Sequence, residues 1–355
     1  MEQTLTVTSE GPPDVNRIAR HMDVVTVEGT RITGYLHYPE KESIAALQAL
    51  FREYGAVGFF RREGSGHVVT YAYLPPQKPA RVWVNVVLLV ATLGTTLLVG
   101  AWQRGANPLV RPSDIWLGLP FSLGIILILG SHELAHYLVA RRLGVDATLP
   151  YFLPIPHPFT GTMGAFIKMR SPVPSRSALV RVGIAGPLAG FAVAIPVSAI
   201  GLALSEQVAV GDAPLLRLGS PLVFEMISRL VHGVPVPGFD VMLHPLGFAG
   251  WLGMFVTALN LLPVGQLDGG HIAYGVLGRR YRTFRWFVLG AVLLMGVFWP
   301  GWLFWALIVI AFGLRHPPPL DDVTRLDRQD RLLVLAAVLL LALTLTPVPF
   351  PGGGL

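Results

Sequence analysis

The sequence contains no cysteine and comparatively few charged residues. Without cysteine, neither a disulfide nor a cysteine-ligated zinc site can form, so a metal would have to be held by histidine and carboxylate side chains. Charged residues make up 14% of the 355 positions, against roughly 25% in soluble globular domains, whereas 52% are hydrophobic. This balance excludes an ordinary soluble domain and indicates a protein that lies largely within a lipid bilayer.

Lysine is scarce as well. Only three of the 27 basic residues are lysines, so the net charge of +6 comes from arginine. No basic run interleaved with aromatic side chains is present, and we therefore expect no nucleic acid partner. In a membrane protein, an excess of arginine instead reflects which loops face the cytoplasm.

Six stretches of the chain lack Asp, Glu, Lys and Arg over roughly the length of a membrane span, which needs about 20 mostly apolar residues. They are residues 82–103, 115–131, 182–205, 241–267, 286–314 and 332–355. A break at Pro300 would divide the fifth stretch into two short spans. Seven spans then follow, at residues 82–102, 115–140, 179–203, 246–263, 285–299, 302–314 and 332–347. We predict a multi-pass α-helical membrane protein with about six to seven transmembrane helices.

The basic residues cluster on one side of this arrangement. With the N-terminus inside, sixteen Lys and Arg residues flank the cytoplasmic ends of the spans, and four flank the opposite ends. Because cytoplasmic loops carry an excess of Lys and Arg, we predict that the N-terminus lies in the cytoplasm. The same distribution favours the break at Pro300, since one continuous span there would place residues 315–331 on the opposite side.

The first part of the chain differs from the rest. Its periodicities predict two strands, a helix and a hairpin, at residues 24–27, 32–38, 43–54 and 59–73. We expect three parts: a small soluble α+β domain on the cytoplasmic side, a transmembrane domain and a short tail, at residues 1–77, 78–347 and 348–355.

A His-Glu-x-x-His pattern lies at the end of the second predicted span. On a helix, His132 and His136 lie one turn apart on a single face, the spacing that lets two imidazoles hold one metal ion. Glu133, next to the first histidine, can act as a general base on a water molecule beside the metal. On a soluble surface helix the pattern is often accidental, but at hydrocarbon depth an unpaired ionisable group is costly. We therefore interpret these residues as a catalytic metal motif.

Two histidines leave a catalytic zinc ion one protein ligand short. The candidate carboxylate is Asp268, in the segment Asn260-Leu-Leu-Pro263-Val-Gly-Gln-Leu-Asp268-Gly269. An Asp followed by glycines at the end of a span is also a common helix cap, so two interpretations are open at this point. The charge balance favours the interpretation of Asp268 as a ligand, because Zn²⁺ with two neutral imidazoles and the carboxylates of Asp268 and Glu133 is neutral overall. Neutrality lowers the cost of burying ionisable groups in a low dielectric.

Together the two motifs resemble the paired signature of the site-2 protease family of intramembrane zinc metalloproteases. Three further segments are similar to that family, Gly161-Thr-Met-Gly164-Ala-Phe-Ile, Arg170-Ser-Pro and Ala185-Gly186-Pro187-Leu-Ala-Gly190. The segment Pro319-Leu-Asp-Asp-Val-Thr324 resembles the bacterial and plastid branch of the family. Residues 204–244 are too few for a PDZ domain, which needs roughly 80–100 residues, so we expect the branch without that domain.

The resemblance implies a role for each residue that matches the motifs. His132, His136 and Asp268 would hold one Zn²⁺ per chain, and Glu133 would act as general base and proton shuttle. Asn260 would hydrogen-bond the substrate backbone or the developing oxyanion. Packing against a neighbouring helix is the alternative role of this amide.

The remaining matches would shape the site. Pro263 would break the fourth core span, and Gly269 directly follows the carboxylate ligand. Gly161 and Gly164 lie in a region, 160–169, that resembles a membrane-associated β-strand or β-hairpin of the family. Adding an unwound substrate segment to such a strand would hold the peptide extended. An ordinary re-entrant loop is the alternative interpretation of this region.

Other histidines are weaker candidates. His271, three residues after Asp268, and His157 in a proline-rich loop could orient a metal ligand. The rest, among them His67 and His316, look like loop or surface residues.

The function that the resemblance implies is hydrolysis of a peptide bond within or near the transmembrane helix of a single-span membrane protein, in the lipid bilayer. We expect a bacterial cell membrane, with the active-site end on the cytoplasmic side. A membrane-anchored gluzincin with a cytosolic site would need a carboxylate soon after His136, for which Asp146 is a poor candidate. A transporter or metal-binding membrane protein could use the same ligands without hydrolysis. The oligomeric state has no signature in this sequence.

Overall fold

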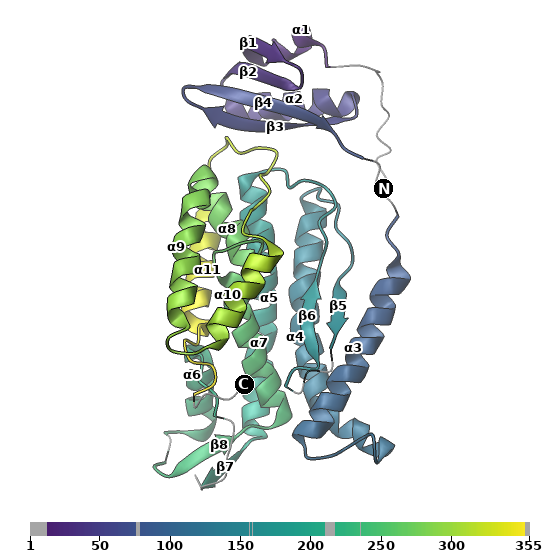
Figure 1. The fold of residues 1–355 in the computed structure, drawn as a ribbon, viewed down its shortest axis with the longest axis vertical. Coiled ribbons are helices and arrows are strands. Elements are labelled where there is room, and N and C mark those ends of the chain that lie inside the picture. The colour runs from purple at the N-terminus through teal and green to yellow at the C-terminus, as the bar shows by residue number, and fades with distance from the viewer. Residues whose placement is uncertain are drawn as a thin grey trace.

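A computed structural model describes residues 13–75, 79–155, 157, 159–209, 217–234 and 236–351. Along the long axis of the molecule, a small sheet with two helices lies at one end and a bundle of helices occupies the middle (Figure 1). The hairpin of strands β7 and β8 lies at the other end of the bundle (Figure 1).

The N-terminal part is a four-stranded antiparallel sheet in the order β1-β2-β4-β3. Its elements are α1 (Val15–Ile18), β1 (Met22–Glu28), β2 (Arg31–Leu36), α2 (Glu40–Glu53), β3 (Ala56–Glu63) and β4 (Gly66–Tyr73). Phe51 of α2 and Phe60 of β3 are fully buried between the helix and the sheet. The strands, the helix and the hairpin that the sequence predicts here are all present.

Three helical segments are long and apolar enough to cross a membrane, within the part of the chain that the structure describes. They are α3 (Val82–Gln103), α4 (Leu119–Arg142) with the preceding 3₁₀ helix η1 (Pro112–Gly118), and α5 (Arg176–Ala203). All three coincide with predicted spans. They establish a membrane-associated helical fold, whereas the full count of six to seven spans stays a prediction.

The other predicted spans form shorter helices. They are α7 (Pro245–Leu261), α9 (Tyr281–Met295), α10 (Gly301–Phe312) and α11 (Arg328–Thr344), with α6 (Leu222–His232), α8 (Asp268–Leu277) and η2 (Gly278–Arg280) between them. The chain does break between α9 and α10, as the Pro300 break requires. The 17 residues of α7 cover about 26 Å, slightly less than the roughly 30 Å of a hydrocarbon core.

Two small hairpins accompany the helices. β5 (Tyr151–Pro154) and β6 (Thr162–Phe166) pair antiparallel between α3 and α4 (Figure 1). This hairpin falls in the region where the sequence predicts a membrane-associated strand. β7 (Glu206–Ala209) and β8 (Phe239–Met242) form the second antiparallel pair.

Residues 319–324, here called the connecting segment, join the N-terminal sheet to the helices. The Phe60 N–H donates to the Leu320 carbonyl at 2.7 Å, and the Asp322 N–H donates to the Phe60 carbonyl at 3.1 Å. On the other side, the Leu320 N–H donates to the Val173 carbonyl at 2.9 Å. Val323 packs into the core of the N-terminal sheet and is 7% exposed. The sheet is thus held by part of the loop between α10, which ends at Phe312, and α11, which begins at Arg328.

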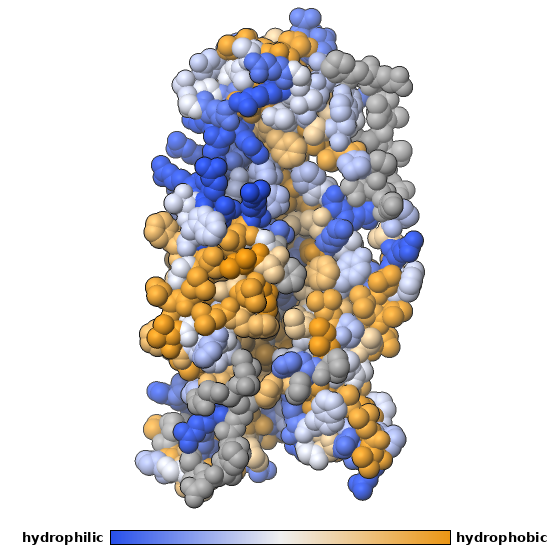
Figure 2. Space-filling view, viewed as in Figure 1, coloured by the Kyte–Doolittle hydropathy of each residue, from blue (hydrophilic) through white to orange (hydrophobic). Residues whose placement is uncertain are grey.

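The surface agrees with a membrane setting. Figure 2 shows hydrophobic residues across the middle of the molecule and hydrophilic residues between that zone and the N-terminal sheet. Leu307 of α10 and Val90 of α3, among others, are more than half exposed. Large exposed apolar areas of this kind fit contact with lipid.

Candidate metal centre

The His-Glu-x-x-His pattern lies in the C-terminal half of α4, where the helix packs closely on α5. His132 and His136 are one helical turn apart and point to the same side, so their rings lie 4.8 Å apart between centroids. His132, Glu133 and His136 are all buried, with exposed fractions of 4%, 7% and 5%. Three ionisable side chains are therefore enclosed together inside the helix bundle.

Asp268 enters the same place from a different helix. α7 ends at Leu261, the chain turns through Pro263, and Asp268 is the first residue of α8. The turn is tight, because a Cβ on Gly269 would overlap the carbonyl oxygen of Leu261. Glycine after the aspartate therefore allows α8 to start directly against the end of α7.

The ligand atoms of the two histidines and Asp268 converge. Oδ2 of Asp268 lies 3.1 Å from Nε2 of His132 and 3.2 Å from Nε2 of His136. The two Nε2 atoms are 3.1 Å apart. Ligand atoms around a tetrahedral zinc ion, each about 2.0–2.1 Å from the metal, lie about 3.3 Å from one another. The three atoms are thus spaced as one zinc ion requires.

The backbone of α5 fixes the orientation of one ligand. Nδ1 of His136 donates to the carbonyl oxygen of Val182 at 2.7 Å. A histidine that donates from Nδ1 carries its lone pair on Nε2, which faces the other two ligand atoms. Sequence reasoning missed Val182, because a backbone carbonyl has no signature in the side chains.

Two glycines of α5 make room for the histidines. A Cβ on Gly186 would overlap Nε2 of His136 and lie 2.7 Å from Cδ2 of His132. A Cβ on Gly190, one turn further along, would lie 3.2 Å from the His132 ring. A Gly-x-x-x-Gly spacing often serves close helix packing, and here it also lets two imidazoles approach α5.

Glu133 faces the hairpin of β5 and β6. Its carboxylate lies beside the backbone of Ile167, the residue directly after β6. Glu133 does not belong to the His-His-Asp group whose ligand atoms all lie within 4.8 Å of one another. A carboxylate that lies beside the metal ligands without being one of them is placed to act as a general base.

Of the remaining candidates, Asn260 of α7 lies next to the cluster, with Nδ2 at 3.5 Å from Nε2 of His132.

Gly161 and Gly164 belong instead to the hairpin, where they have positive φ angles of 64° and 97°. A Cβ on Gly161 would lie 2.9 Å from the Thr95 carbonyl oxygen, so this glycine lets the hairpin approach α3.

Two histidines that sequence reasoning treated separately form a pair. Nδ1 of His271 lies 2.5 Å from Nε2 of His316. His316 lies in the loop between α10 and α11, as expected, and its side chain is partly buried against His271 and Tyr274. His67 is also buried, at 6% exposure, contrary to expectation. In both cases the side chain is covered by a segment distant in sequence.

The donor set fits zinc. It offers two imidazole nitrogens and one carboxylate oxygen, which is a three-ligand set that leaves one position of a tetrahedral site open for water or substrate. Gly186 leaves space at the point where the two imidazoles meet. A membrane-associated helical fold with a buried His-His-Asp group and an adjacent glutamate defines the class of membrane metallohydrolases.

Comparison with protein families agrees with this class. Residues 120–298 match the model of Peptidase family M50. The chain belongs to this family, which is the site-2 protease family that the sequence motifs resemble.

Among known proteins, the chain is similar to plant zinc metalloproteases. It is 34% identical to "Probable zinc metalloprotease EGY1, chloroplastic" of Arabidopsis thaliana, over 76% of this chain and 54% of that protein. It is 32% identical to "Probable zinc metalloprotease EGY2, chloroplastic" of the same plant, over 66% and 42%. It is also 32% identical to "Probable zinc metalloprotease EGY3, chloroplastic" of Oryza sativa, over 76% and 48%. The chain spans about half the length of these relatives.

No solved structure matches the chain. The chloroplast location in the relatives' names conflicts with the bacterial cell membrane that the sequence analysis expected. The apolar helices support membrane association without specifying the membrane.

Proposed function

We propose that this protein is a zinc-dependent metalloendopeptidase that hydrolyses peptide bonds within or near the transmembrane helix of membrane-anchored, single-span substrates. The observation that carries the proposal is the convergence of His132, His136 and Asp268, with Glu133 beside them, inside the helix bundle. The membership of Peptidase family M50 and the similarity to zinc metalloproteases support the same activity.

The side chains divide the chemistry among them. His132, His136 and Asp268 would hold the zinc ion, which when bound supplies polarisation of the scissile carbonyl and a lowered pKa for the attacking water. Glu133 takes the proton of that water and delivers it to the leaving amine. Asn260, 3.5 Å from His132, can donate from its amide to the oxygen that gains negative charge.

The hairpin offers a way to hold the substrate. A helical peptide bond is shielded by its own backbone hydrogen bonds, so the substrate has to unwind before cleavage. β6 pairs with β5 along one edge, and no other strand pairs with it among the described residues. Because β6 ends beside Ile167, which contacts Glu133, a substrate strand added to its free edge would pass the general base.

We also propose how the chain is divided into domains. Residues 78–347 would form the protease domain, and residues 1–77 a soluble domain over its cytoplasmic end. The basic residues near the cluster, among them Arg141 and Arg142 at the end of α4, favour a cytoplasmic location for that end.

The direct test is the substitution Glu133→Gln in the purified protein, reconstituted in lipid vesicles with a single-span test substrate. We expect zinc content to stay the same, because glutamine leaves the three ligands in place. Cleavage should fall by roughly 10²–10⁴-fold, the usual contribution of a general acid–base group. Cleavage is followed by gel shift of the substrate and zinc by elemental analysis.

The matched control is Glu225→Gln, on α6, which removes a carboxylate that pairs with Arg229 and lies outside the cluster. It should retain full activity. Activity of Glu133→Gln close to that of the wild type would remove Glu133 from the mechanism. Zinc binding without any cleavage by the wild type would favour a metal-binding or transport role.

A further inference from the structure

A basic pocket of about 790 Å³ lies where the N-terminal sheet meets the helices. Its lining includes the arginines Arg61, Arg279, Arg280, Arg282, Arg285 and Arg315. Asp322 is the one carboxylate among the lining residues. The volume falls within the range of about 300–1,000 Å³ that is usual for small-ligand sites.

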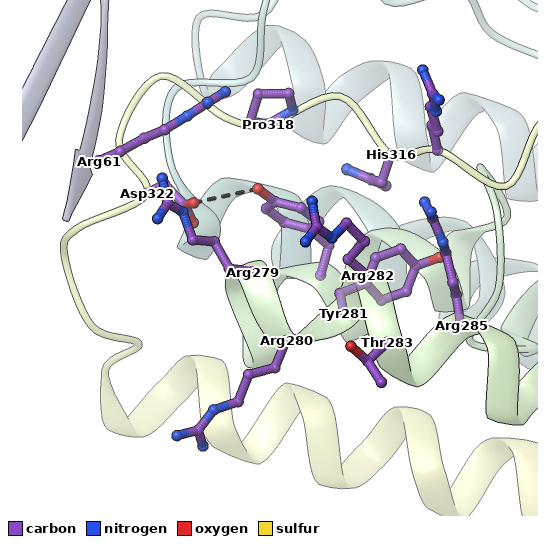
Figure 3. Close-up of a pocket in the computed structure, with 12 residues that line it drawn as sticks. Arg61, Arg279, Arg280, Tyr281, Arg282, Thr283, Arg285, His316, Pro318 and Asp322 are labelled. Carbon is purple, nitrogen blue, oxygen red and sulfur yellow. Dashed lines mark hydrogen bonds between the residues drawn. The ribbon is translucent and has the colours of Figure 1, made fainter. Parts of the chain in front are cut away.

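The arginines come from elements far apart in sequence. Arg61 lies on β3, Arg279 on η2, and Arg282 in the first turn of α9. Figure 3 shows Arg61 reaching in from the N-terminal strand, while Arg279 and Arg282 extend from the helical side and Arg280 points away from them. Folding therefore brings like charges together, which costs free energy unless an anion is present.

Protein groups neutralise only part of this charge. Arg279 forms an ion pair with Glu63 at 2.8 Å, and Arg285 donates from Nη1 to the Leu314 carbonyl at 3.2 Å. Nε of Arg285 is buried without a hydrogen-bond partner among the residues that the structure describes. Within the same residues, Arg282 has no ion-pair partner within 4.0 Å.

An excess of cytoplasmic arginine would by itself explain charges that project into water, but not charges that line a hollow. Water-exposed arginines satisfy their donors with solvent, whereas the buried Nε of Arg285 cannot. The charge is also shared between two parts of the fold that are separate in sequence. The unpartnered Nε of Arg285 and the arginines from two parts of the fold both favour a ligand that accepts several hydrogen bonds.

The surroundings of the pocket resemble a membrane boundary. Arg285 lies over the ring of Trp286 at 5.5 Å, and Trp286 and Phe287 are 56% and 73% exposed. In Figure 2, hydrophilic residues border the hydrophobic zone on the side where α9 lies. A ligand in the pocket would thus have cations around one end and exposed aromatic side chains beside it.

We propose that this pocket binds a phosphate-bearing anion. Phosphate oxygens match the planar fork of arginine, which donates two parallel hydrogen bonds to one group. The phosphate comes either from the headgroup of an anionic phospholipid in the adjoining leaflet or from a soluble phosphate compound. Bound there, it bridges Arg61 of the N-terminal sheet and Arg282 of α9.

The test measures binding by isothermal titration calorimetry to the full-length protein in an uncharged detergent. The probes are short-chain phosphatidylglycerol, short-chain phosphatidylcholine and inorganic pyrophosphate. We expect one saturable site per chain for phosphatidylglycerol or pyrophosphate and none for phosphatidylcholine. Binding of phosphatidylglycerol alone identifies a lipid headgroup, and binding of pyrophosphate identifies a soluble phosphate ligand.

Variants distinguish the pocket from general attraction to a positive surface. Arg282→Gln should weaken binding about tenfold, and Arg61→Gln, in a different part of the fold, should do the same. Arg328→Gln removes an equal charge at the exposed start of α11, outside the pocket lining, and should change the affinity less than about twofold. The proposal is overturned if neither probe binds saturably, or if Arg328→Gln weakens binding as much as Arg282→Gln.

Discussion

Gly186 on α5 is as necessary to the geometry of the metal centre as the ligands on α4. The two imidazoles occupy the space that a side chain at this position would fill. Interiors are packed closely enough that even one methyl group has to be accommodated by moving something. Here the groups that would move are the ligands themselves.

Gly186→Ala should therefore weaken zinc binding by about 10–100-fold, the usual effect of disturbing groups that support a ligand. Gly190→Ala should have a smaller effect, because its nearest contact would be at 3.2 Å. Gly94→Ala, on α3, is the matched control, since a Cβ there meets nothing within 4 Å. Competition with a chromophoric chelator measures the affinity. Equal affinities for the three variants would contradict the role assigned to α5.

At the scale of single elements, strand β4 contains an unusual buried histidine. Nδ1 of His67 accepts from the Leu36 N–H at 3.2 Å, so the neutral ring carries its proton on Nε2, which faces Glu40 at 3.2 Å. If Nδ1 also bound a proton, its N–H would point at the Leu36 N–H, and this hydrogen bond would be lost. Burial lowers the pKa of His67 from its ordinary value of 6.5 and outweighs the opposing effect of Glu40.

The sign of the pH dependence follows from this shift. Because the folded state binds the proton less readily than the unfolded state, the contribution of His67 to stability is present above pH 6.5 and is lost as the pH falls below it. We expect the corrected hydrogen-exchange protection of β2 and β4 to decrease between about pH 7.5 and about pH 5.5. His67→Gln, which can still accept from Leu36, should show a smaller decrease. The same decrease in both proteins would rule out His67 as the cause.

At the scale of the whole molecule, polar contacts tie the last helix to the bundle. Asp330 of α11 is fully buried and accepts from Arg181 at 2.8 Å and from Ser177 at 2.9 Å, both on α5. The buried carboxylate also completes a capping box with Asp327 at the start of α11. α11 is thus fixed at the end of the helix that supplies Val182 and Gly186 to the site.

Asp330→Ala should destabilise the protein by about 3 kcal/mol, because it leaves Arg181 without its buried partner, although Arg181 is itself partly exposed. For a chain of this size that corresponds to a melting point lower by about 4 °C. Asp327→Asn is the control, since it keeps the cap and removes only an exposed ion pair worth under about 1 kcal/mol. Thermal unfolding in detergent measures both. A melting point of Asp330→Ala within about 1 °C of the control would show that α11 is held by apolar packing alone.

Much of the helical part could be predicted from the sequence because its signals are local. Charge-free stretches predict α3, α4 and α5 directly, since apolar length alone decides whether a helix can cross a bilayer. The shorter helices show the limit of that reasoning. A stretch such as 241–267 contains a whole helix, α7, and also the turn that leads to Asp268, and composition does not separate the two.

The sequence by itself determined that His132 and His136 share one helix face, because one helical turn fixes their spacing. It also determined the apolar character of the helices and the alternation of the N-terminal strands. Only the tertiary structure decided that Asp268 lies 3.1 Å from His132 across 136 positions of sequence. It also decided that Gly186 leaves room for the two imidazoles, and that Arg61 and Arg282 line one pocket. These contacts depend on how whole helices pack against one another, which local periodicity does not contain.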